Sequence, residues 1–373
     1  MQALRSMKVC RPIAMTPSSR APLSQRMASP GRSLRRAVPA ARSSGAAARR
    51  ASVLARGLVA GLLLAAIDTS AIGRAQPVAP ATPQPQPGAG QLNPRGPLRF
   101  VMVSKVGHPW FEQVRQGALA AAAMLSSQTG RAVSIEELSP SAATIPLQQA
   151  MLRRAIASRP AGIFIDLLDP LQLNPLLQQA RSAGIALTVF DSVSPDGLGI
   201  TAVGNDDCRQ ATIASERLAA LLGGRGQVAI MQGVPTAPNH AIRFRCHQEV
   251  LRRFPAIQVV ATPSDQDDID RAEREALATM RAHPNLAGWL SSDASGPIGI
   301  GRAIRSLSAQ NRVKAVGIDD LPELVAQIRS GVVDSSVATR PRAQGYWAVL
   351  ALWQQTLAAP SIERIDTGIT LVR

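Results

Sequence analysis

Short runs of apolar and β-branched residues alternate with amphipathic stretches from Leu98 onward, and this alternation most limits the possible folds. The stretches between the runs, such as 109–128 and 208–223, carry apolar residues at helical spacing. Most of the short runs are apolar without interruption, which is typical of strands covered on both faces. A β-α alternation of this kind predicts parallel sheets with right-handed crossovers. Nine runs are expected to be strands: 98–104, 132–138, 162–167, 186–191, 200–205, 227–233, 257–263, 287–292 and 313–319.

The number of predicted strands favours two domains. A single open sheet of about ten parallel strands would be large. We therefore expect an α/β protein with two doubly wound parallel-sheet lobes, the second beginning near residue 206. In such sheets ligands bind beyond the carboxyl ends of the strands. The residues that follow the strands here are polar and acidic, among them Lys105, Asp166, Asp191 and Asp319.

The formal net charge of +16 suggests a nucleic-acid partner, but the placement of the charge argues against one. Residues 1–75 hold 13 of the 41 basic residues and one of the 25 acidic residues. The remainder carries 28 basic and 24 acidic residues, which gives no basic face for neutralising phosphates. We expect no nucleic-acid partner.

The basic N-terminal segment has the parts of an export signal. Arginines at 49, 50 and 56 precede the apolar run 57–67, and small residues then lead to Ala75. The run is too short for an ordinary membrane-spanning helix. We expect residues 1–75 to be an export signal cleaved near Ala75, leaving a periplasmic protein. An uncleaved anchor, export by the twin-arginine route and a start at Met27 stay open.

Residues 76–97 are rich in Pro, Gln and Ala without periodicity, which predicts an extended linker. Beyond the leader the chain has two cysteines, Cys208 and Cys246. They could pair in an oxidising compartment. Their spacing does not decide whether they do.

A series of motifs in fixed order resembles the periplasmic sugar-binding proteins of the ribose and galactose type, which feed ABC importers. The resemblance covers about 98–373. The motifs are H-P-W-F at 108–111, P-A-G-I-F-I at 160–165, A-G-I-A-L-T-V-F-D at 183–191, G-N-D-D at 204–207, Q-G at 232–233, S-S-D at 291–293, V-G-I-D-D at 316–320 and R-S-G at 329–331.

The resemblance implies a type I periplasmic binding protein fold, in which the chain crosses three times between lobes. These crossings are expected near Asn205, Thr339 and Gly368. The first ligand-binding lobe would then be 98–205 plus 340–367, and the second 206–339 plus 368–373. The two lobes would close on the ligand by a hinge motion.

Sugar binding needs aromatic faces against C–H groups and charged groups that hydrogen-bond to hydroxyls. Pro109 fits the first position of a helix and would set Trp110 and Phe111 at the mouth of a cleft. The alternative is that both rings cap the core of their lobe. By resemblance, Asp191 and Asp319 accept hydrogen bonds from ligand hydroxyls, and Arg245 faces them across the cleft.

Four further positions match the family's ligand contacts but carry different residues. His108 and Ser292 stand where Asn is usual, Ser192 where ribose binders have Arg, and Thr339 where Gln is usual. Gln266 also falls where an aromatic residue often closes the pocket. These differences predict a ligand that is larger than ribose or differently shaped, or else a weaker pocket.

Other signals carry no chemistry. His240, Cys246 and His247 might suggest a metal site, but Cys246 and His247 lie on different faces of a predicted helix over 241–254 and no further ligand is obvious, so we expect none. The acidic run 264–270 lacks the glycine and glutamate of a calcium loop, and is interpreted as the capped start of a helix. Without a nucleophile elbow or phosphate loop, we expect a binding protein with no cofactor rather than an enzyme.

The sequence therefore predicts an exported, monomeric receptor that captures a small polyhydroxylated ligand and delivers it to an ABC importer. The alternative is a periplasmic sensor that passes ligand occupancy to a membrane kinase or chemoreceptor. Transcription repressors of the lac-repressor type share the fold but need a helix-turn-helix before the first lobe. Residues 1–97 carry an apolar signal and a Pro-rich segment in that place.

Overall fold

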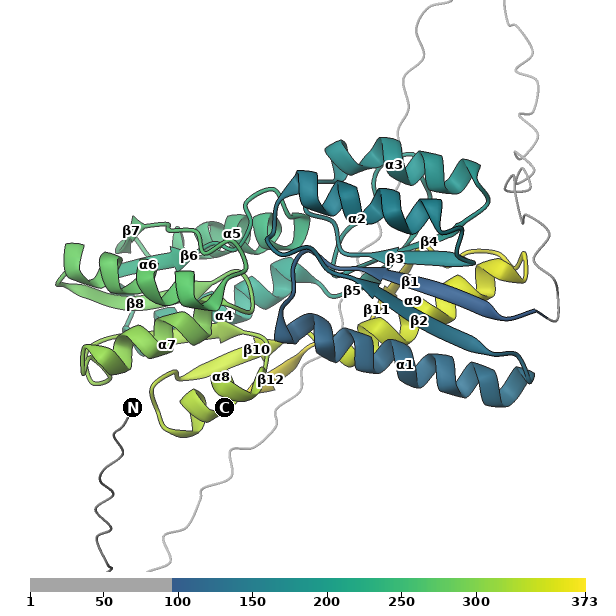
Figure 1. Ribbon diagram of the computed structural model, residues 1–373. Coiled ribbons are helices and arrows are strands. Elements are labelled where there is room, and N and C mark those ends of the chain that lie inside the picture. Colours follow the sequence, from purple (N-terminus) through teal and green to yellow (C-terminus); the bar gives the residue numbers. More distant parts are fainter. Residues whose placement is uncertain (1–95) are drawn as a thin grey trace, which may run out of the picture. The chain divides into compact units, whose positions relative to one another are not determined.

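The computed structural model describes residues 96–373, which form two six-stranded sheets flanked by helices (Figure 1). The predicted export signal, and the predicted linker up to residue 95, lie outside the described residues. No helix within 96–373 is long and apolar enough to cross a membrane.

The first sheet contains the strands that the sequence predicted for the first lobe, together with one short later strand. Its order is β11 (Arg364–Asp366), β5 (Thr201–Gly204), β4 (Ala186–Phe190), β3 (Gly162–Ile165), β1 (Leu98–Val103) and β2 (Val133–Leu138). All of its strand pairs are parallel. Buried side chains such as Phe100, Phe164 and Phe190 form its core.

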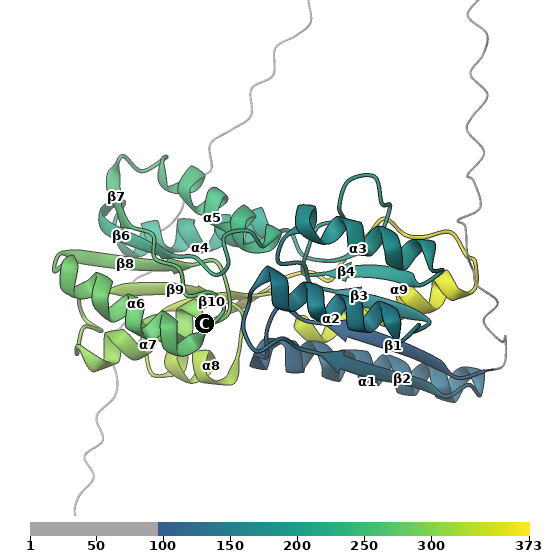
Figure 2. The same ribbon diagram turned by 45° about the horizontal axis from the view of Figure 1, so that its top comes forward.

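Helices cover both faces of the first sheet (Figures 1 and 2). One face carries α2 (Ile145–Ala157) and α3 (Pro170–Ser182), and the other carries α1 (Pro109–Thr129) and α9 (Pro341–Thr356). The backbones of α1 and α9 approach very closely. A Cβ atom at Gly345 would lie 1.9 Å from the Val114 carbonyl oxygen, so only glycine fits there.

The second sheet repeats this plan. Its order is β12 (Thr370–Val372), β10 (Ser335–Ala338), β9 (Lys314–Ile318), β8 (Leu286–Ser291), β6 (Arg225–Met231) and β7 (Ala256–Ala261). Its helices are α4 (Asp207–Leu221), α5 (Pro238–Leu251), α6 (Ile269–Ala282), α7 (Gly296–Ser306) and α8 (Pro322–Arg329). Helices α4 and α5 pack together, as do α6 and α7.

Both sheets have the strand order 2-1-3-4-5 in their five main strands, and the order reverses between the first and third strand of each. This is the doubly wound plan, and the reversal is where such folds bind ligands. The two-sheet α/β fold predicted from the alternation is confirmed. One edge of the second sheet departs from the parallel pattern, because β12 pairs with β10 in antiparallel fashion.

All nine predicted strands are present, and α1 and α4 match the two predicted helices. The strands β10, β11 and β12 were not among the nine. As predicted for 264–270, an acidic residue caps the next helix: Asp268 Oδ1 accepts a hydrogen bond from the Arg271 amide.

The chain passes from the elements of one sheet to those of the other three times: after β5, after β10 and between β11 and β12. Two amide side chains connect these passages. Asn205 Nδ2 donates to Thr367 Oγ1 (3.0 Å). Gln344 Nε2 donates to Asn205 Oδ1 (2.8 Å) and to the Thr339 carbonyl (3.1 Å). The three segments are thus hydrogen-bonded to one another.

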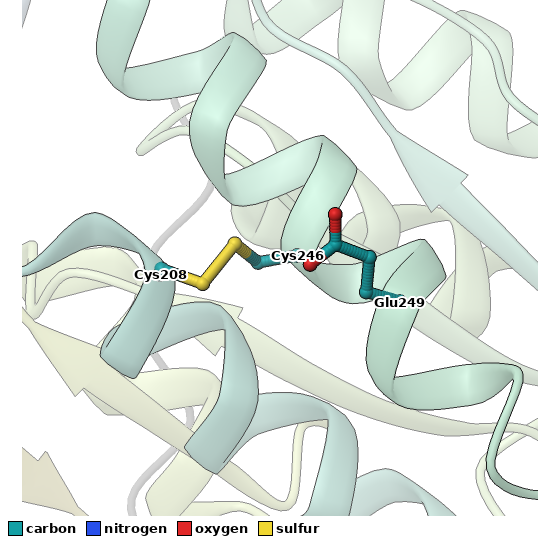
Figure 3. Close-up of side chains that lie close together, drawn as sticks. All are labelled: Cys208, Cys246 and Glu249. Atoms are coloured by element: carbon teal, nitrogen blue, oxygen red, sulfur yellow. A yellow bond between two sulfur atoms is a disulfide. The ribbon is translucent and has the colours of Figure 1, made fainter. Parts of the chain in front are cut away.

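Cys208 and Cys246 form a disulfide that joins the first turn of α4 to α5 (Figure 3). The sequence left this pairing open, and the fold brings the two Cα atoms to 5.4 Å. Glu249 lies beside the bridge, within 4.8 Å of its sulfurs. The sulfurs are bonded to each other, so the group offers no thiolate for a metal ion.

Candidate ligand-binding cleft

A buried ion pair lies where the strand order of the first sheet reverses, at the ends of β1 and β3. Lys105 follows β1 and Asp166 follows β3, and Lys105 Nζ lies 3.1 Å from Asp166 Oδ2. The same ammonium lies 3.4 Å from Asn239 Oδ1 and 3.2 Å from His240 Nε2, in the first turn of α5. Lys105 therefore connects the strand ends of the first sheet to a helix of the second.

Asp191 and Asp319 follow β4 and β9 and are both buried. Each has a left-handed backbone, with φ of 44° and 73°, a conformation that Asp and Asn adopt more readily than most residues. Asp191 Oδ2 accepts a hydrogen bond from Asn239 Nδ2 (2.5 Å). Asp191 Oδ1 accepts one from Gln344 Nε2 (3.3 Å).

Trp110 and Phe111 lie in both of the places that the sequence left open. Both rings line a small cavity in the cleft, and both pack in the hydrophobic core. The Trp110 ring stacks on Phe190, with a 12° angle between the planes. Its Nε1 donates to Asp319 Oδ1 (3.0 Å) and to Thr339 Oγ1 (3.0 Å). Trp110 thus joins α1 to the strand ends of the second sheet.

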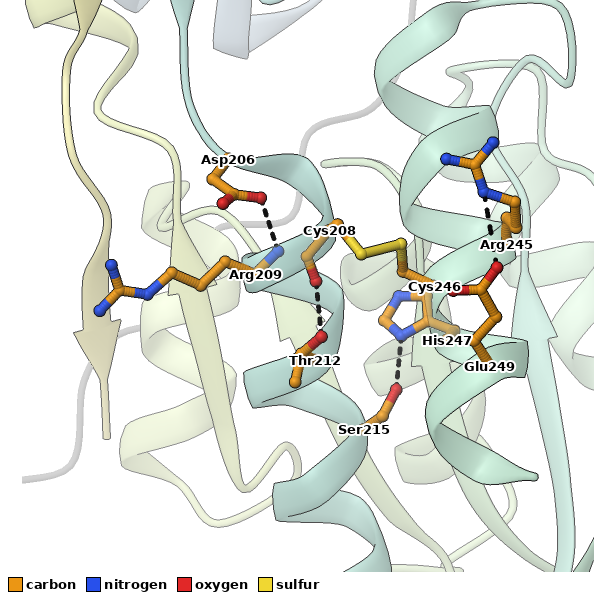
Figure 4. The surroundings of a disulfide bond; sticks show 9 residues. All are labelled: Asp206, Cys208, Arg209, Thr212, Ser215, Arg245, Cys246, His247 and Glu249. Carbon is orange, nitrogen blue, oxygen red and sulfur yellow. Dashed lines mark hydrogen bonds and ion pairs between the residues drawn. A yellow bond between two sulfur atoms is a disulfide. The ribbon is translucent and has the colours of Figure 1, made fainter. Parts of the chain in front are cut away.

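The prediction of Arg245 as the arginine of the cleft is wrong by two residues. Arg245 is exposed and forms an ion pair with Glu249 on the outer side of α5, as Figure 4 shows. Arg243 is the arginine of the cleft, only 1% exposed, with Nη2 2.7 Å from Asp207 Oδ1 and 3.3 Å from Asp191 Oδ1. A helix turns about 100° per residue, so two residues separate opposite faces.

The other predicted residues lie close by. His108 caps α1, with Nδ1 accepting from the Trp110 amide (3.2 Å) and Nε2 lying 3.1 Å from Ser295 Oγ. The Ser292 carbonyl accepts from Arg243 Nη1 (3.3 Å). Ser192 and Ser292 are buried, and their hydroxyls have no hydrogen-bond partner among residues 96–373. Gln266 donates instead to Ser264 Oγ.

Several cleft residues were not among the predicted contacts. They are Lys105, Asp166, Asn239, His240, Arg243 and Asp267. Helix α5 begins at Pro238 rather than near 241. With that start, positions 239, 243 and 247 share one buried face. Pro238 is the signal that could have placed them, because proline favours the first turn of a helix.

Burial dominates the electrostatics of the cleft. It raises the pKa of Asp319 to about 7, although Arg243 and the hydrogen bonds from Thr339 and Trp110 lower it. Burial alone would lower the pKa of Lys105, but Asp166, Asp267 and Asp191 together outweigh it and raise that pKa. Burial also holds the pKa of His240 well below its usual value, so this ring is neutral at pH 7.

The space left between these side chains is small. The cleft cavity has a volume of about 10 Å³, which is room for about one water molecule. A second cavity of about 290 Å³ adjoins it at Asp191, and its lining includes Ser192, Asp207 and Glu363. A sugar ring therefore needs the cleft side chains or the two sheets to move apart.

This geometry agrees with the comparisons to known proteins. Residues 99–358 match the family model described as "Periplasmic binding protein domain". The chain belongs to this family, whose members are binding proteins rather than enzymes. This confirms the resemblance to type I periplasmic binding proteins of the ribose and galactose type that the ordered motifs predicted.

Two curated relatives are sugar-binding proteins by name. The chain is 25% identical to the D-ribose/D-allose-binding protein of Pseudomonas aeruginosa over 50% of this chain and 60% of that one. It is 25% identical to the xylose/arabinose-binding protein XylF of Sulfolobus acidocaldarius over 76% and 73%, respectively. The match to the first relative spans less than two thirds of that relative's length.

The fold is also similar to solved structures. One is an ABC transporter solute-binding protein of Burkholderia graminis in complex with D-arabinose, with 26% identity and a TM-score of 0.70. That match covers 75% of this chain and 96% of the other. A sugar-binding protein of Bacillus halodurans gives 28% identity and a TM-score of 0.61, covering 74% and 97%.

Proposed function

We propose that this protein captures a sugar or sugar-like ligand between two lobes and delivers it to an ABC importer. The observation that carries the proposal is the ring of buried polar groups from both sheets: Trp110, Asp191, Arg243 and Asp319. Such a ring offers charge-assisted hydrogen bonds to hydroxyl groups beside an aromatic face. The names of the relatives support a sugar as the ligand class.

The lobes are proposed to be 98–205 plus 340–367 and 206–339 plus 368–373. Hinges near Asn205, Thr339 and Gly368 would let them open, as the small cleft cavity requires. A ligand that binds the closed form better shifts the population towards it by its differential affinity. His108, Trp110, Phe111, Asp191, Ser192, Ser292, Asp319 and Thr339 remain proposed contacts, with Arg243 in place of Arg245.

Export to the periplasm is part of the proposal. The disulfide between Cys208 and Cys246 supports it, because such bonds persist in oxidising compartments. Cleavage near Ala75 would leave a mature, monomeric receptor, and mass spectrometry of the periplasmic fraction tests this. An intact N-terminus found in the membrane fraction would contradict it. The alternative prediction stays a periplasmic sensor that passes ligand occupancy to a membrane kinase or chemoreceptor.

A thermal-shift panel of pentoses, hexoses and polyols, with amino acids as the unrelated class, tests the ligand class. Binding raises the melting temperature through mass action, by an amount that grows with ligand concentration relative to Kd. We expect a shift with at least one sugar or polyol and none with the amino acids. The absence of a shift with every polyhydroxylated compound would contradict the proposal.

A further inference from the structure

The cleft carries more carboxyl groups than cations. Its lining includes four aspartates and two cationic side chains, Lys105 and Arg243. A fifth aspartate, Asp207, forms an ion pair with Arg243. The four aspartates of the lining are Asp166, Asp191, Asp267 and Asp319. The adjoining cavity adds Asp206 and Glu363 against one arginine, Arg364. Buried carboxylates without a cation are costly, and the cost falls either by protonation, as the raised pKa of Asp319 shows, or by the binding of a positive charge.

Among the ion pairs of the cavity, the contact to Asp267 is long, at 3.8 Å from Lys105 Nζ. Lys105 pairs with Asp166 at 3.1 Å, and Arg243 lies 2.7 Å from Asp207 and 3.3 Å from Asp191. Asp267 is only 7% exposed, and its Oδ2 has no hydrogen-bond partner among the described residues.

Asp267 shares its nearest cation with another carboxylate. The ammonium of Lys105, at 3.8 Å, is closer to Asp166. The ring of His240 lies 3.9 Å away and is neutral at pH 7 because it is buried. Asp267 is therefore a carboxylate in the cleft wall whose Oδ2 lacks a hydrogen-bond donor among the described residues and whose nearest cation, Lys105, is shared with Asp166.

The cleft already shows how it accommodates an ammonium group. Lys105 Nζ lies among Asp166 Oδ2, Asn239 Oδ1 and Asp267 Oδ2, at 3.1, 3.4 and 3.8 Å. Oxygen acceptors from both sheets thus surround a nitrogen with three donor hydrogens. A ligand ammonium placed against Asp267 Oδ2 would meet the same kind of acceptor. Its positive charge would balance part of the negative charge of the carboxylates.

We propose that the ligand of this cleft is an amino sugar or amino polyol, with its ammonium group bound by Asp267 and its hydroxyls by the remaining polar groups. The inference rests on the proposed sugar-binding function and names the ligand class for that site. It implies discrimination by charge: an ammonium form binds better than the corresponding neutral polyol, and an acidic form binds worse.

Calorimetric titration with matched pairs tests this proposal. The pairs are D-glucosamine and D-glucose, D-galactosamine and D-galactose, and glucamine and sorbitol, with D-glucuronate as the acidic form. We expect the ammonium form of at least one pair to bind about 10- to 100-fold more tightly, the range for a hydrogen bond to a charged group. Asp267→Asn should abolish that preference, so that the ammonium form and the neutral form bind with similar affinity.

Asn fits the left-handed backbone at position 267, where φ is 59°, so this variant keeps the fold. Asp196→Asn, at an exposed position, makes the same change in net charge and should keep the preference. Equal or tighter binding of the neutral forms would overturn this inference and leave sugar binding intact. A preference that survives Asp267→Asn would also overturn it. If no compound of any pair binds to the folded protein, the proposed function falls, and the inference with it.

Discussion

The indole Nε1 of Trp110 lies 3.0 Å from Asp319 Oδ1, although 209 positions separate the two residues in the chain. Trp110 belongs to the first turn of α1 beside the first sheet, and Asp319 follows β9 of the second. This hydrogen bond, with those of Asp191 and Lys105, holds the two sheets together through groups that could instead bind a ligand.

Trp110→Phe should favour opening of the ligand-free protein. The ring can still stack on Phe190, but Asp319 loses a buried donor, which costs about 1–3 kcal/mol. We expect a larger radius of gyration by small-angle scattering, together with a lower melting temperature. Trp347→Phe is the matched control, because Trp347 is 44% exposed on α9. An equal effect of both variants would show that the hydrogen bond is not responsible.

Arg243→Met should destabilise the protein far more than Arg245→Met. Arg243 is the counter-charge of two buried carboxyl groups, and removal of one member of a buried pair costs about 3–5 kcal/mol. Arg245 is exposed, so its replacement should change the unfolding free energy by about 0.5 kcal/mol or less. Chemical denaturation measures both, and similar losses would contradict the assignment of Arg243 to the cleft.

The fold was predictable because it rests on local patterns. Apolar runs and amphipathic stretches mark the strands and helices, and strand ends mark the region of the site. Asp191 and Asp319 could be found by this rule, since they directly follow strands. Lys105 and Asp166 also follow strands, but the sequence does not show that they pair across the reversal of strand order.

The faces of α5 were harder to predict, because the sequence does not show which of its arginines points toward the strand ends. Arg245 was chosen by resemblance, and the structure places Arg243 in the cleft instead. The sequence also did not decide whether the two cysteines pair. They lie 38 residues apart, and only the packing of α4 on α5 brings them together.

Removal of the disulfide should lower stability. By the chain-entropy account, a bridge closing a loop of 38 residues contributes about 4 kcal/mol. We expect a reductant to lower the melting temperature of the wild type and to leave the Cys208→Ala/Cys246→Ala variant unchanged. Equal sensitivity of both proteins to the reductant would contradict the prediction.

Asp319 should make stability depend on pH. Burial raises its pKa from 3.8 to about 7, so between these values the folded protein holds a proton that the unfolded chain releases. The contribution of Asp319 to stability therefore falls as the pH rises from about 4 to 7. His247, whose pKa burial lowers from 6.5 to about 4, acts in the opposite direction, so stability rises with pH across its window.

A comparison with Asp319→Asn isolates the effect of Asp319. The variant should gain stability relative to the wild type as the pH rises through this range, measured as the difference in melting temperature. Asn suits the left-handed backbone at this position, which keeps the two proteins comparable. A constant difference from pH 4 to pH 8 would refute the raised pKa of Asp319.

The most direct test of a sugar-binding cleft is calorimetric titration of the best panel ligand into wild type, Asp191→Asn and Arg245→Met. Asp191 is buried where the two sheets meet, and loss of its charge should weaken binding by about 2 kcal/mol or more, because the groups facing it stay desolvated. Arg245→Met should bind like the wild type, since Arg245 lies outside the cleft. Unchanged affinity in a folded Asp191→Asn variant would contradict the account.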